Sequence, residues 1–371
     1  MSVWICRWTW PEPSIASRAS RSKTVFLSKM SDLSKIRIGV IGCGHWGPNH
    51  VRVFSQLPGS EVTACADPEE RRRDAIRSQF PTVNAYQNHQ ELLARAPVDA
   101  VVIAAPTRFH FEGVRDALLA DKHVLCEKPL CLVAAEAAEL IALATQRKRI
   151  LMVGHIFLFN GGIRKLKDLI RAPGTGRIHY LRATRMNLGP IRSDVNCVYD
   201  LATHDLAIFN WLLDAAPVSV SAVGGCFLQQ KIEDVAFISL CYPDNILANV
   251  QVSWMDPKKL REIVVVTEKK MLAWDDLASP GPVTIYDKSI DRPPDYRDFG
   301  QFQLITRDGD LTIPKVALQE PLKAQNSFFL DAIRAGHLSF NDGPFTMGVL
   351  HTLEAIAESL KQGGAAVSVA K

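Results

Sequence analysis

The chain has 371 residues, 47% of them hydrophobic and 22% charged, and its formal net charge at pH 7 is +4. This length predicts two domains, and the apolar fraction is large enough to bury a core in each. Five basic residues and one acidic residue lie in positions 1–30, so the remaining 38 basic residues are balanced by 38 acidic ones. Such a balance argues against nucleic acid or an anionic membrane as a partner. The sequence also lacks the uninterrupted apolar run that a membrane-spanning helix requires.

Residues 1–34 are predicted to form a leader outside the folded body. The segment contains Trp4, Trp8 and Trp10 and continues into a run rich in serine and arginine. One interpretation is an organelle transit peptide, which has this basic and acid-poor composition. The favoured interpretation is an upstream start codon, with Met30 as the working start and residues 1–29 dispensable.

Eight cysteines are scattered along the chain without a C-x-x-C pair or a paired zinc-ligand spacing. The sequence therefore predicts no metal site. Most of these cysteines lie within apolar runs, where a free thiol behaves as a small hydrophobic group. Unpaired thiols of this kind indicate a reducing compartment, so we expect a cytoplasmic protein.

The first apolar run, 36–41, leads into Gly42-Cys43-Gly44-His45-Trp46-Gly47, and a helical pattern follows. The first glycine permits a tight turn, the second lets the backbone approach a pyrophosphate, and the third lets the helix pack close to the strand. The start of a helix also offers free N–H groups to phosphate oxygens. This motif predicts a dinucleotide site that includes Gly42, Gly44, His45, Trp46 and Gly47.

A second apolar run ends at Asp67, twenty residues beyond Gly47. At this place a carboxylate accepts hydrogen bonds from the ribose hydroxyls of an adenosine and repels a 2′-phosphate, so the motif predicts NAD rather than NADP. The arginines at 71–73 are basic enough to attract that phosphate. A solvated basic helix face is the favoured interpretation of this run.

From residue 35 to residue 156, short apolar runs alternate with amphipathic segments. This alternation predicts a doubly wound parallel sheet of the Rossmann type. The expected strands are 36–41, 62–67, about 83–86, 100–104, 123–126 and 150–153. The expected helices include 68–79, 109–120 and 132–147, whose apolar residues recur at spacings of three and four.

Residues 157–371 have a different pattern and predict an α+β domain for substrate binding and assembly. Strand patterns follow one another without helices between them, which indicates a large and mostly antiparallel sheet. The expected strands are 177–188, 217–228, 234–241, 246–254, 260–267 and 270–275, and the expected helices are 163–171, 200–213, 320–334 and 344–361. Residues 279–314 are rich in proline, aspartate and glycine and predict an irregular surface excursion.

Two loops after later strands are predicted to face the same crevice as the dinucleotide. One loop contains Pro106, Thr107 and His110, and the other contains Glu127 and Lys128 before a proline. A lysine held at a strand end lies near the nicotinamide, and burial there lowers its pKa toward a useful catalytic range. A surface turn is an equally good interpretation of this lysine from the pattern alone.

Asp200 and His204 are four residues apart at the start of a predicted helix. This spacing places them on one face, where the carboxylate can orient and stabilise a protonated imidazole. A general base that removes a hydroxyl proton needs such an arrangement. An ordinary helix ion pair is the alternative interpretation.

Taken together, these motifs resemble the Gfo/Idh/MocA oxidoreductases over residues 35–370. The ordered set is Gly42 to Gly47, Ala105-Pro106-Thr107 with His110, Glu127-Lys128-Pro129, Gly154-His155 and Asp200-x-x-x-His204. The resemblance implies that Lys128, Asp200 and His204 line the active site and that the Lys128–Pro129 peptide is cis. It also implies a homodimer or homotetramer built through the second domain.

Within the family, the stretch 187–196 resembles a branch that includes UDP-N-acetylglucosamine 3-dehydrogenases. On this resemblance the substrate-binding residues are His155, Asn160, Arg192 and Asn196. Arg182, Arg185 and Arg192 are further candidates for a substrate diphosphate, although surface charge explains these three arginines equally well.

The expected function is NAD-dependent oxidation of a ring hydroxyl, at C3 of a UDP-linked N-acetylhexosamine, to a ketone. His204 is expected to take the proton, with Lys128 stabilising the developing charge or replacing it as the base. Three alternatives stay open: an NADPH-dependent keto-sugar reductase, an NAD-dependent glycosidase, and a non-catalytic regulator that binds NAD.

Overall fold

The computed structural model describes residues 35–291 and 305–370. The predicted leader, 1–34, lies outside the described residues, as does the part of the predicted excursion at 292–304. Within the described ranges, no helix combines the length and apolar character needed to span a bilayer.

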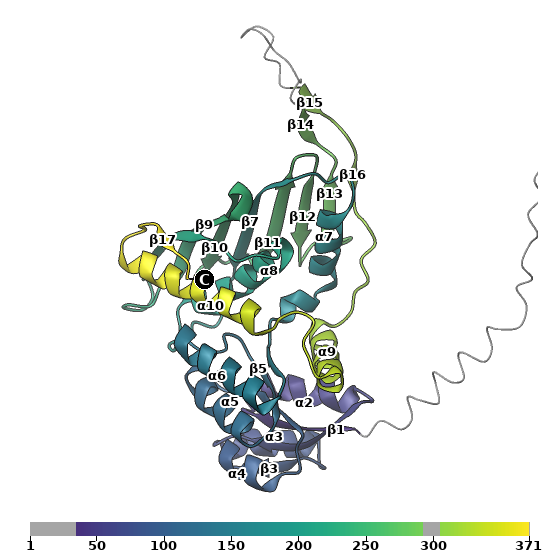
Figure 1. The fold of residues 1–371 in the computed structure, drawn as a ribbon, viewed down its shortest axis with the longest axis vertical. Helices are drawn as coiled ribbons and strands as arrows, with labels where there is room; N and C mark the ends of the chain where they lie inside the picture. The colour runs from purple at the N-terminus through teal and green to yellow at the C-terminus, as the bar shows by residue number, and fades with distance from the viewer. Residues whose placement is uncertain (1–34, 292–304, 371) are drawn as a thin grey trace, which may run out of the picture. The chain divides into compact units, whose positions relative to one another are not determined.

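The first half forms a parallel sheet with strand order β3-β2-β1-β4-β5-β6 in the described residues (Figure 1). Its strands are β1 (Ile36–Ile41), β2 (Ser60–Ala66), β3 (Asn84–Tyr86), β4 (Ala100–Ile103), β5 (His123–Cys126) and β6 (Leu151–Val153). The helices between them are α2 (Gly47–Gln56), α3 (Glu70–Gln79), α4 (His89–Arg95), α5 (His110–Leu119) and α6 (Ala134–Arg147). All four residues of β4 are buried, because helices cover both faces of such a sheet. The predicted doubly wound Rossmann fold is confirmed.

The strand order reverses between β1 and β4, which both pair with neighbours on either side. Loops after these strands diverge to opposite faces of the sheet and leave a crevice at its carboxyl edge. The glycine-rich turn follows β1, and the loops predicted to face it follow β4 and β5. The topology therefore brings the predicted cofactor residues to one edge.

The second half is built on a larger sheet with strand order β16-β13-β12-β11-β7-β10-β9-β8-β17 among the described residues. Its strands are β7 (Ile178–Met186), β8 (Ser219–Gly225), β9 (Val235–Tyr242), β10 (Ile246–Ser253), β11 (Leu260–Thr267), β12 (Met271–Asp275), β13 (Val283–Tyr286), β16 (Leu311–Thr312) and β17 (Val367–Ser368). The pairing is antiparallel except between β7 and β10, which run parallel. The chain can return in the same direction because a helix and two strands separate β7 from β10. The predicted α+β region with a mostly antiparallel sheet is confirmed.

The prediction of an irregular excursion over residues 279–314 was wrong in its described part. β13 pairs with β12 and extends the large sheet, and β16 pairs with β13. β14 (Ser289–Asp291) and β15 (Ile305–Arg307) form a separate antiparallel pair. The short run of residues 283–286 becomes a strand by pairing with β12 and β16, and the flanking prolines and aspartates hid it in the sequence.

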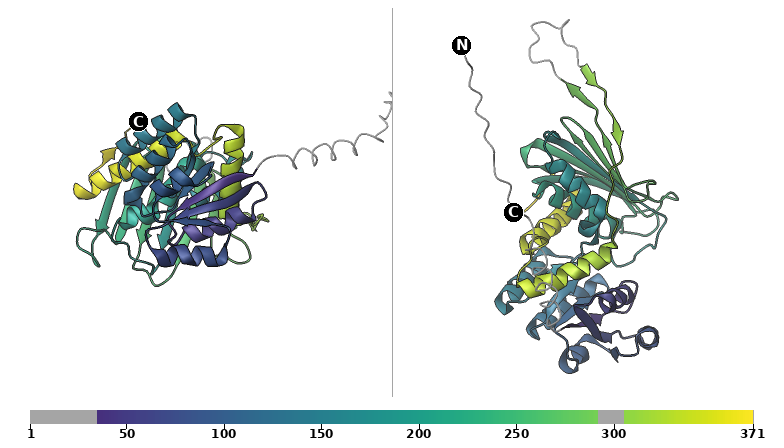
Figure 2. Two further views of the ribbon diagram at one scale, coloured as in Figure 1. Left: turned by 90° about the horizontal axis from the view of Figure 1, so that it is seen from below. Right: turned by 90° about the vertical axis from the view of Figure 1, so that its right-hand side faces the viewer.

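Helices cover one face of the large sheet (Figures 1 and 2). They are α7 (Gly161–Arg171), α8 (Thr203–Leu213), which follows a π-helical turn η3 (Val198–Ala202), and α10 (Gly343–Lys361). Along β9 buried and exposed residues alternate, so the opposite face of the sheet is open. This open face is the surface through which assembly is considered below.

α9 (Pro321–Ala335) packs against α2, and α10 packs against α6. At the first contact Arg52 forms an ion pair with Glu320, and at the second the backbone N–H of Ala134 donates to Glu354 at 2.7 Å. The two closing helices thus contact helices of the Rossmann half, and α10 also packs against β8 of the large sheet.

Candidate active site

The glycine-rich turn has the geometry that its spacing predicts. Gly42 has a φ of +94°, and a Cβ there would lie 2.6 Å from the backbone of Ala104. A Cβ on Gly47 would lie 2.0 Å from the carbonyl oxygen of Gly42. A Cβ on Gly44 would meet only the Arg72 guanidinium, at 3.8 Å, so the backbone there is open to a ligand. The turn and the start of α2 fit the pyrophosphate of a dinucleotide.

Asp67 follows β2 and is buried beside this turn. Its carboxylate accepts the backbone N–H of Cys43 at 2.8 Å and that of Glu69 at 2.9 Å. Arg72 lies 3.8 Å from the same carboxylate, whereas the Arg73 guanidinium donates to the carbonyl of Asp67 at 2.7 Å. Among the three arginines at 71–73, Arg72 is thus the one whose guanidinium lies near both the Asp67 carboxylate and Gly44.

His110 ties the two predicted loops together. Its Nδ1 lies 2.8 Å from the carbonyl oxygen of Pro129, and its Nε2 lies 2.8 Å from that of Ala105. Burial lowers the pKa of His110, and the hydrogen bonds to the two carbonyls partly offset this effect because they favour the protonated ring. Thr107 is buried in the same loop, after Pro106. The ring therefore holds the loop after β4 against the loop after β5.

The loop after β5 is held from its other side by α2 and α9. His50 on α2 contacts Glu127 at 3.0 Å, and the Asn326 amide on α9 contacts the other ring nitrogen of His50 at 3.3 Å. The next peptide, Lys128–Pro129, is cis. That feature was implied by the family resemblance and is confirmed.

Lys128 projects from this loop into the second domain. Its Nζ donates to the backbone carbonyl of Asp200 at 2.5 Å and lies 3.3 Å from the Asp200 carboxylate. Burial lowers the pKa of Lys128, and the charge of Asp200 opposes this effect. The surface-turn interpretation of this lysine is therefore excluded by its position.

Asp200 binds other partners than the predicted one. Its carboxylate contacts Lys128, the Arg192 guanidinium at 3.3 Å and the indole N–H of Trp254 at 3.1 Å. No hydrogen bond joins it to His204 in the described structure, although the sequence spacing predicts that pair. Asp200 lies in the π-helical turn η3, where the residues per turn exceed those of an α-helix and the four-residue alignment shifts.

His155 is buried and His204 is partly buried, and the charge of Lys128 acts on both rings. The Nδ1 atoms of both rings have no hydrogen-bond partner in the described residues. Burial and the charges of Lys128 and Arg185 lower the pKa of His204 well below its usual value. Burial and the Lys128 charge lower the pKa of His155 to about 3. Both rings are therefore neutral at physiological pH, unlike the protonated imidazole expected for His204.

Lys128, Asp200 and His204 line a cavity of about 620 Å³ between the Rossmann half and the second half of the fold. Its lining comes from the glycine-rich turn, the loop after β5, η3, α8 and the strands of the large sheet. The predicted residues that line it are His45, Trp46, Glu127, Lys128, Asn160, Arg185, Asp200 and His204. Other residues that line it are Phe157, Arg261, Asp276 and Gln319. No motif identified these four, because each faces the cavity only through tertiary packing.

Arg185 is buried and forms a bidentate ion pair with Asp205, with N–O distances of 2.7 and 2.8 Å. Its guanidinium carbon lies 4.4 Å from the ring centre of Phe157, which in turn packs edge-on against His204. Arg182, three residues earlier on β7, is exposed at a hollow on the open face of the sheet. Because side chains alternate along a strand, these two arginines cannot serve one diphosphate.

Three of the four predicted substrate residues hydrogen-bond to other side chains. Asn160 caps α7 through its side-chain oxygen, and its amide donates to Asp276 at 3.1 Å. Asn196 donates to Glu233 at 2.7 Å and accepts from the backbone of Tyr199. Arg192 binds Asp194 in a bidentate pair and contacts Asp200. Of the set, Asn160 lines the cavity, while Arg192 reaches it through Asp200.

A dinucleotide turn, a buried acid after β2, and a lysine and a histidine that line one cavity form a site suited to hydride transfer. The lysine and the neutral imidazole can exchange a proton with a hydroxyl held between them. The fold and the site are therefore those of a nicotinamide-dependent oxidoreductase.

Comparisons with known proteins agree with this class. Residues 36–155 match the model of the Gfo/Idh/MocA oxidoreductase family with an NAD-binding Rossmann fold, and residues 163–273 match the model of the Gfo/Idh/MocA C-terminal domain. The chain is similar to a UDP-N-acetylglucosamine 3-dehydrogenase of Acidithiobacillus ferrooxidans, at 31% identity over 83% of this chain and 92% of that protein. It is also similar to a myo-inositol 2-dehydrogenase of Thermotoga maritima, at 29% identity over 53% of this chain and 60% of that protein.

Solved structures show the same relationship. The structure of UDP-N-acetylglucosamine 3-dehydrogenase from Acidithiobacillus ferrooxidans has a TM-score of 0.75 and 28% identity, covering 88% of this chain and 98% of that one. An NAD complex of GenD2 from gentamicin A biosynthesis has a TM-score of 0.77 and 21% identity, covering 91% and 97%, and shows the fold alone. The chain belongs to the Gfo/Idh/MocA oxidoreductase family. The predicted family, enzyme class and NAD cofactor are confirmed.

Proposed function

We propose that this oxidoreductase converts a ring hydroxyl of a sugar, C3 of a UDP-linked N-acetylhexosamine, to a ketone. One observation carries the proposal: Lys128 from the Rossmann domain and His204 from the second domain line one cavity beside the glycine-rich turn. The similarity to a UDP-N-acetylglucosamine 3-dehydrogenase supports the nucleotide sugar as the substrate class. NAD, when bound, accepts the hydride at its nicotinamide ring.

The geometry favours Lys128 as the proton acceptor, with His204 hydrogen-bonded to the same hydroxyl oxygen. Asp200 holds the Lys128 ammonium through its backbone carbonyl and its carboxylate, and burial lowers the pKa of this lysine. His204 is surrounded by the charges of Lys128 and Arg185, which oppose its protonation. The sequence predicted His204 as the base and Lys128 as the group that stabilises the developing charge. This proposal exchanges those two roles, because Asp200 hydrogen-bonds to Lys128.

The proposed function is tested with a panel of UDP-sugars and both cofactors, following absorbance of the reduced nicotinamide. We expect turnover of UDP-N-acetylglucosamine with NAD and at least about a tenfold lower kcat/KM with NADP, because Asp67 repels a 2′-phosphate. Identification of the product as the 3-keto sugar separates this activity from glycoside cleavage.

Three results would contradict the proposal. A preference for NADP would show that Arg72, beside Asp67, recruits the phosphate, and would favour the keto-sugar reductase. Release of a free sugar from a glycoside would favour the glycosidase. Binding of NAD without turnover of any sugar would favour the regulator.

We also propose that the chain assembles as a homodimer or homotetramer through the open face of the large sheet. Tyr180 on β7, Phe237 on β9 and Leu247 on β10 are 44%, 47% and 54% exposed on adjacent strands. Leu247 faces Tyr180 across the β7–β10 pair, and Phe237 faces the exposed Val223 across the β9–β8 pair. Large exposed apolar patches are uncommon on a monomer. Light scattering at micromolar concentration should report two or four subunits, and Phe237→Glu should shift the population toward monomers. A native chain that is monomeric under these conditions would refute the assembly.

A further inference from the structure

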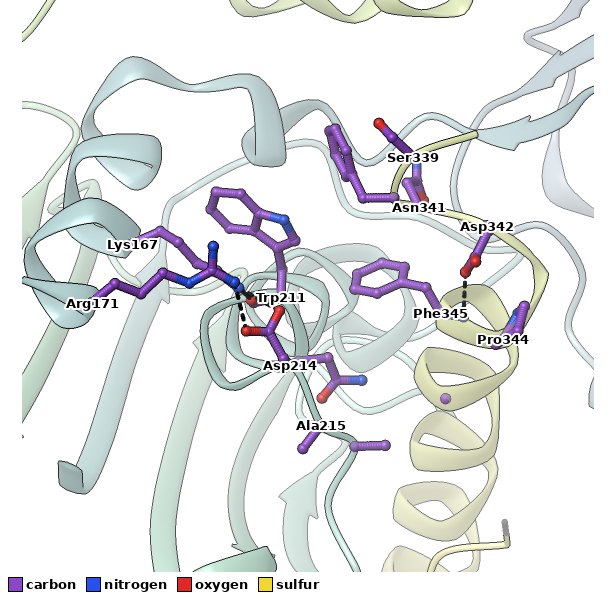
Figure 3. Close-up of a pocket in the computed structure, with 14 residues that line it drawn as sticks. Lys167, Arg171, Trp211, Asp214, Ala215, Ser339, Asn341, Asp342, Pro344 and Phe345 are labelled. Carbon is purple, nitrogen blue, oxygen red and sulfur yellow. Dashed lines mark hydrogen bonds and ion pairs between the residues drawn. The ribbon is translucent and has the colours of Figure 1, made fainter. Parts of the chain in front are cut away.

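A second cavity, of about 510 Å³, lies in the second half of the fold (Figure 3). It is enclosed by α7, α8, the turn before α10 and the first turns of α10. Its walls include Asn210, Trp211, Phe340, Asn341, Phe345 and Gly348. Among the described residues, the two cavities have no lining residue in common. The ring of Phe345 packs edge-on against His155, with the ring centres 5.7 Å apart.

Two buried side-chain amides in these walls each have one polar atom with a hydrogen-bond partner and one polar atom without a partner in the described residues. Asn210 is 4% exposed and accepts from the Tyr242 hydroxyl at 2.8 Å, but its amide nitrogen has no partner among the described residues. Asn341 is 1% exposed and donates to the carbonyl of Val153 at 2.6 Å, but its amide oxygen has no partner in the part of the chain that the structure describes. A buried polar atom without a partner is costly, so these two atoms favour a ligand that both accepts and donates.

The charged groups of the cavity are already paired. Lys167 and Arg171 on α7 bind the Asp214 carboxylate at 2.6 and 2.8 Å, and Figure 3 shows these contacts. The Asp342 carboxylate accepts the backbone N–H of Phe345 at 3.1 Å and caps α10. Two basic and two acidic side chains cancel in formal charge. An anion would therefore find no unneutralised cation here.

From these observations we propose that the second cavity binds a neutral, hydroxyl-rich ligand, a sugar or a polyol. A hydroxyl group both donates and accepts, so adjacent hydroxyls can satisfy the amide oxygen of Asn341 and the amide nitrogen of Asn210. The rings of Trp211, Phe340 and Phe345 supply apolar walls for the C–H face of such a ligand. A concave site with apolar walls and a few placed polar groups is typical of small-molecule binding, and its volume lies within the usual range.

Gly348 provides a substitution that reduces the cavity without disturbing either amide directly. It lies within α10, where alanine is better tolerated than glycine. An added Cβ would lie 3.8 Å from the amide nitrogen of Asn210 and 3.3 Å from the Cβ of Ala216. Gly113→Ala on α5 is the matched control, because its Cβ would meet only Ile103, at 3.7 Å, far from this cavity in the fold.

The probe is N-acetyl-D-glucosamine, and its binding to the native chain is followed by saturation-transfer NMR. Gly348→Ala should raise its Kd at least about tenfold, a loss expected when one polar contact is blocked, whereas Gly113→Ala should leave Kd within about twofold. Asn210→Asp should weaken binding similarly, because it keeps the acceptor for Tyr242 and removes the free donor.

Three results would overturn the assignment. They are no binding by the native chain, equal binding by the native and Gly348→Ala chains, and displacement of the probe by inorganic phosphate. Equal binding would place the probe elsewhere, including the active site, and displacement by phosphate would indicate an anion site. None of these readouts depends on turnover, so failure of the proposed dehydrogenase activity would leave the test intact.

Discussion

Lys128→Met should lower kcat by a factor of about one hundred or more and leave the affinity for NAD nearly unchanged. The Lys128 ammonium lies in the cavity and binds Asp200, whereas the open backbone for the pyrophosphate lies at the glycine-rich turn. The lost group therefore acts on the hydroxyl rather than on the dinucleotide. Steady-state kinetics and a titration of NAD into the variant measure the two quantities separately.

The pH profile identifies the base. Because burial lowers the pKa of Lys128, its neutral form appears at a lower pH than for a free lysine, whose pKa is 10.5. In the oxidation direction, kcat/KM should rise with pH through this lowered pKa and then level off. Lys128→Met should abolish the rise of kcat/KM with pH. His204→Asn should reduce kcat/KM at every pH but leave its rise with pH in place. A rise that survives in Lys128→Met and disappears in His204→Asn would instead make the histidine the base.

Asp205→Asn should destabilise the protein by about 3–5 kcal/mol, the usual cost of breaking a buried ion pair by removing one partner. The pair with Arg185 is bidentate, and the side chains are 1% and 4% exposed. Without the carboxylate, the guanidinium is left as an uncompensated charge between β7 and α8. Urea unfolding of the native and variant chains, followed by circular dichroism, measures the difference.

Asp74→Asn is the matched control for this substitution. Asp74 pairs with Arg77 on the surface of α3, where both side chains are about half exposed. Such surface pairs contribute roughly 0–1 kcal/mol, so the control should unfold almost as the native chain does. Replacing both partners of the buried pair, by Arg185→Met with Asp205→Leu, should recover much of the stability lost in Asp205→Asn. A loss in Asp205→Asn no larger than in the control would show that the buried guanidinium is otherwise compensated.

The sequence alone determined the Rossmann half of the protein. The turn at Gly42 to Gly47 requires glycines for reasons that are local, since Gly42 has a positive φ, Gly47 prevents a clash with the backbone of Gly42, and Gly44 leaves the backbone open to a ligand. Strands β1 to β6 were predictable because each is a short apolar run between turn residues, and periodicity predicted α5 and α6. The ordered motifs were enough to indicate the family and its cofactor.

Only the tertiary structure decided which side chains meet in the site. Asp200 pairs with Lys128, 72 residues away, and with Trp254, 54 residues away, although His204 is the partner that its spacing suggests. Asn160, predicted to bind substrate, caps α7 and holds Asp276. The second cavity likewise joins residues from α7, α8 and α10. Local sequence specifies backbone conformation and the apolar face of each element. The partner of a buried polar group depends on how distant elements pack, because that packing decides which charges and amides share one water-excluded space.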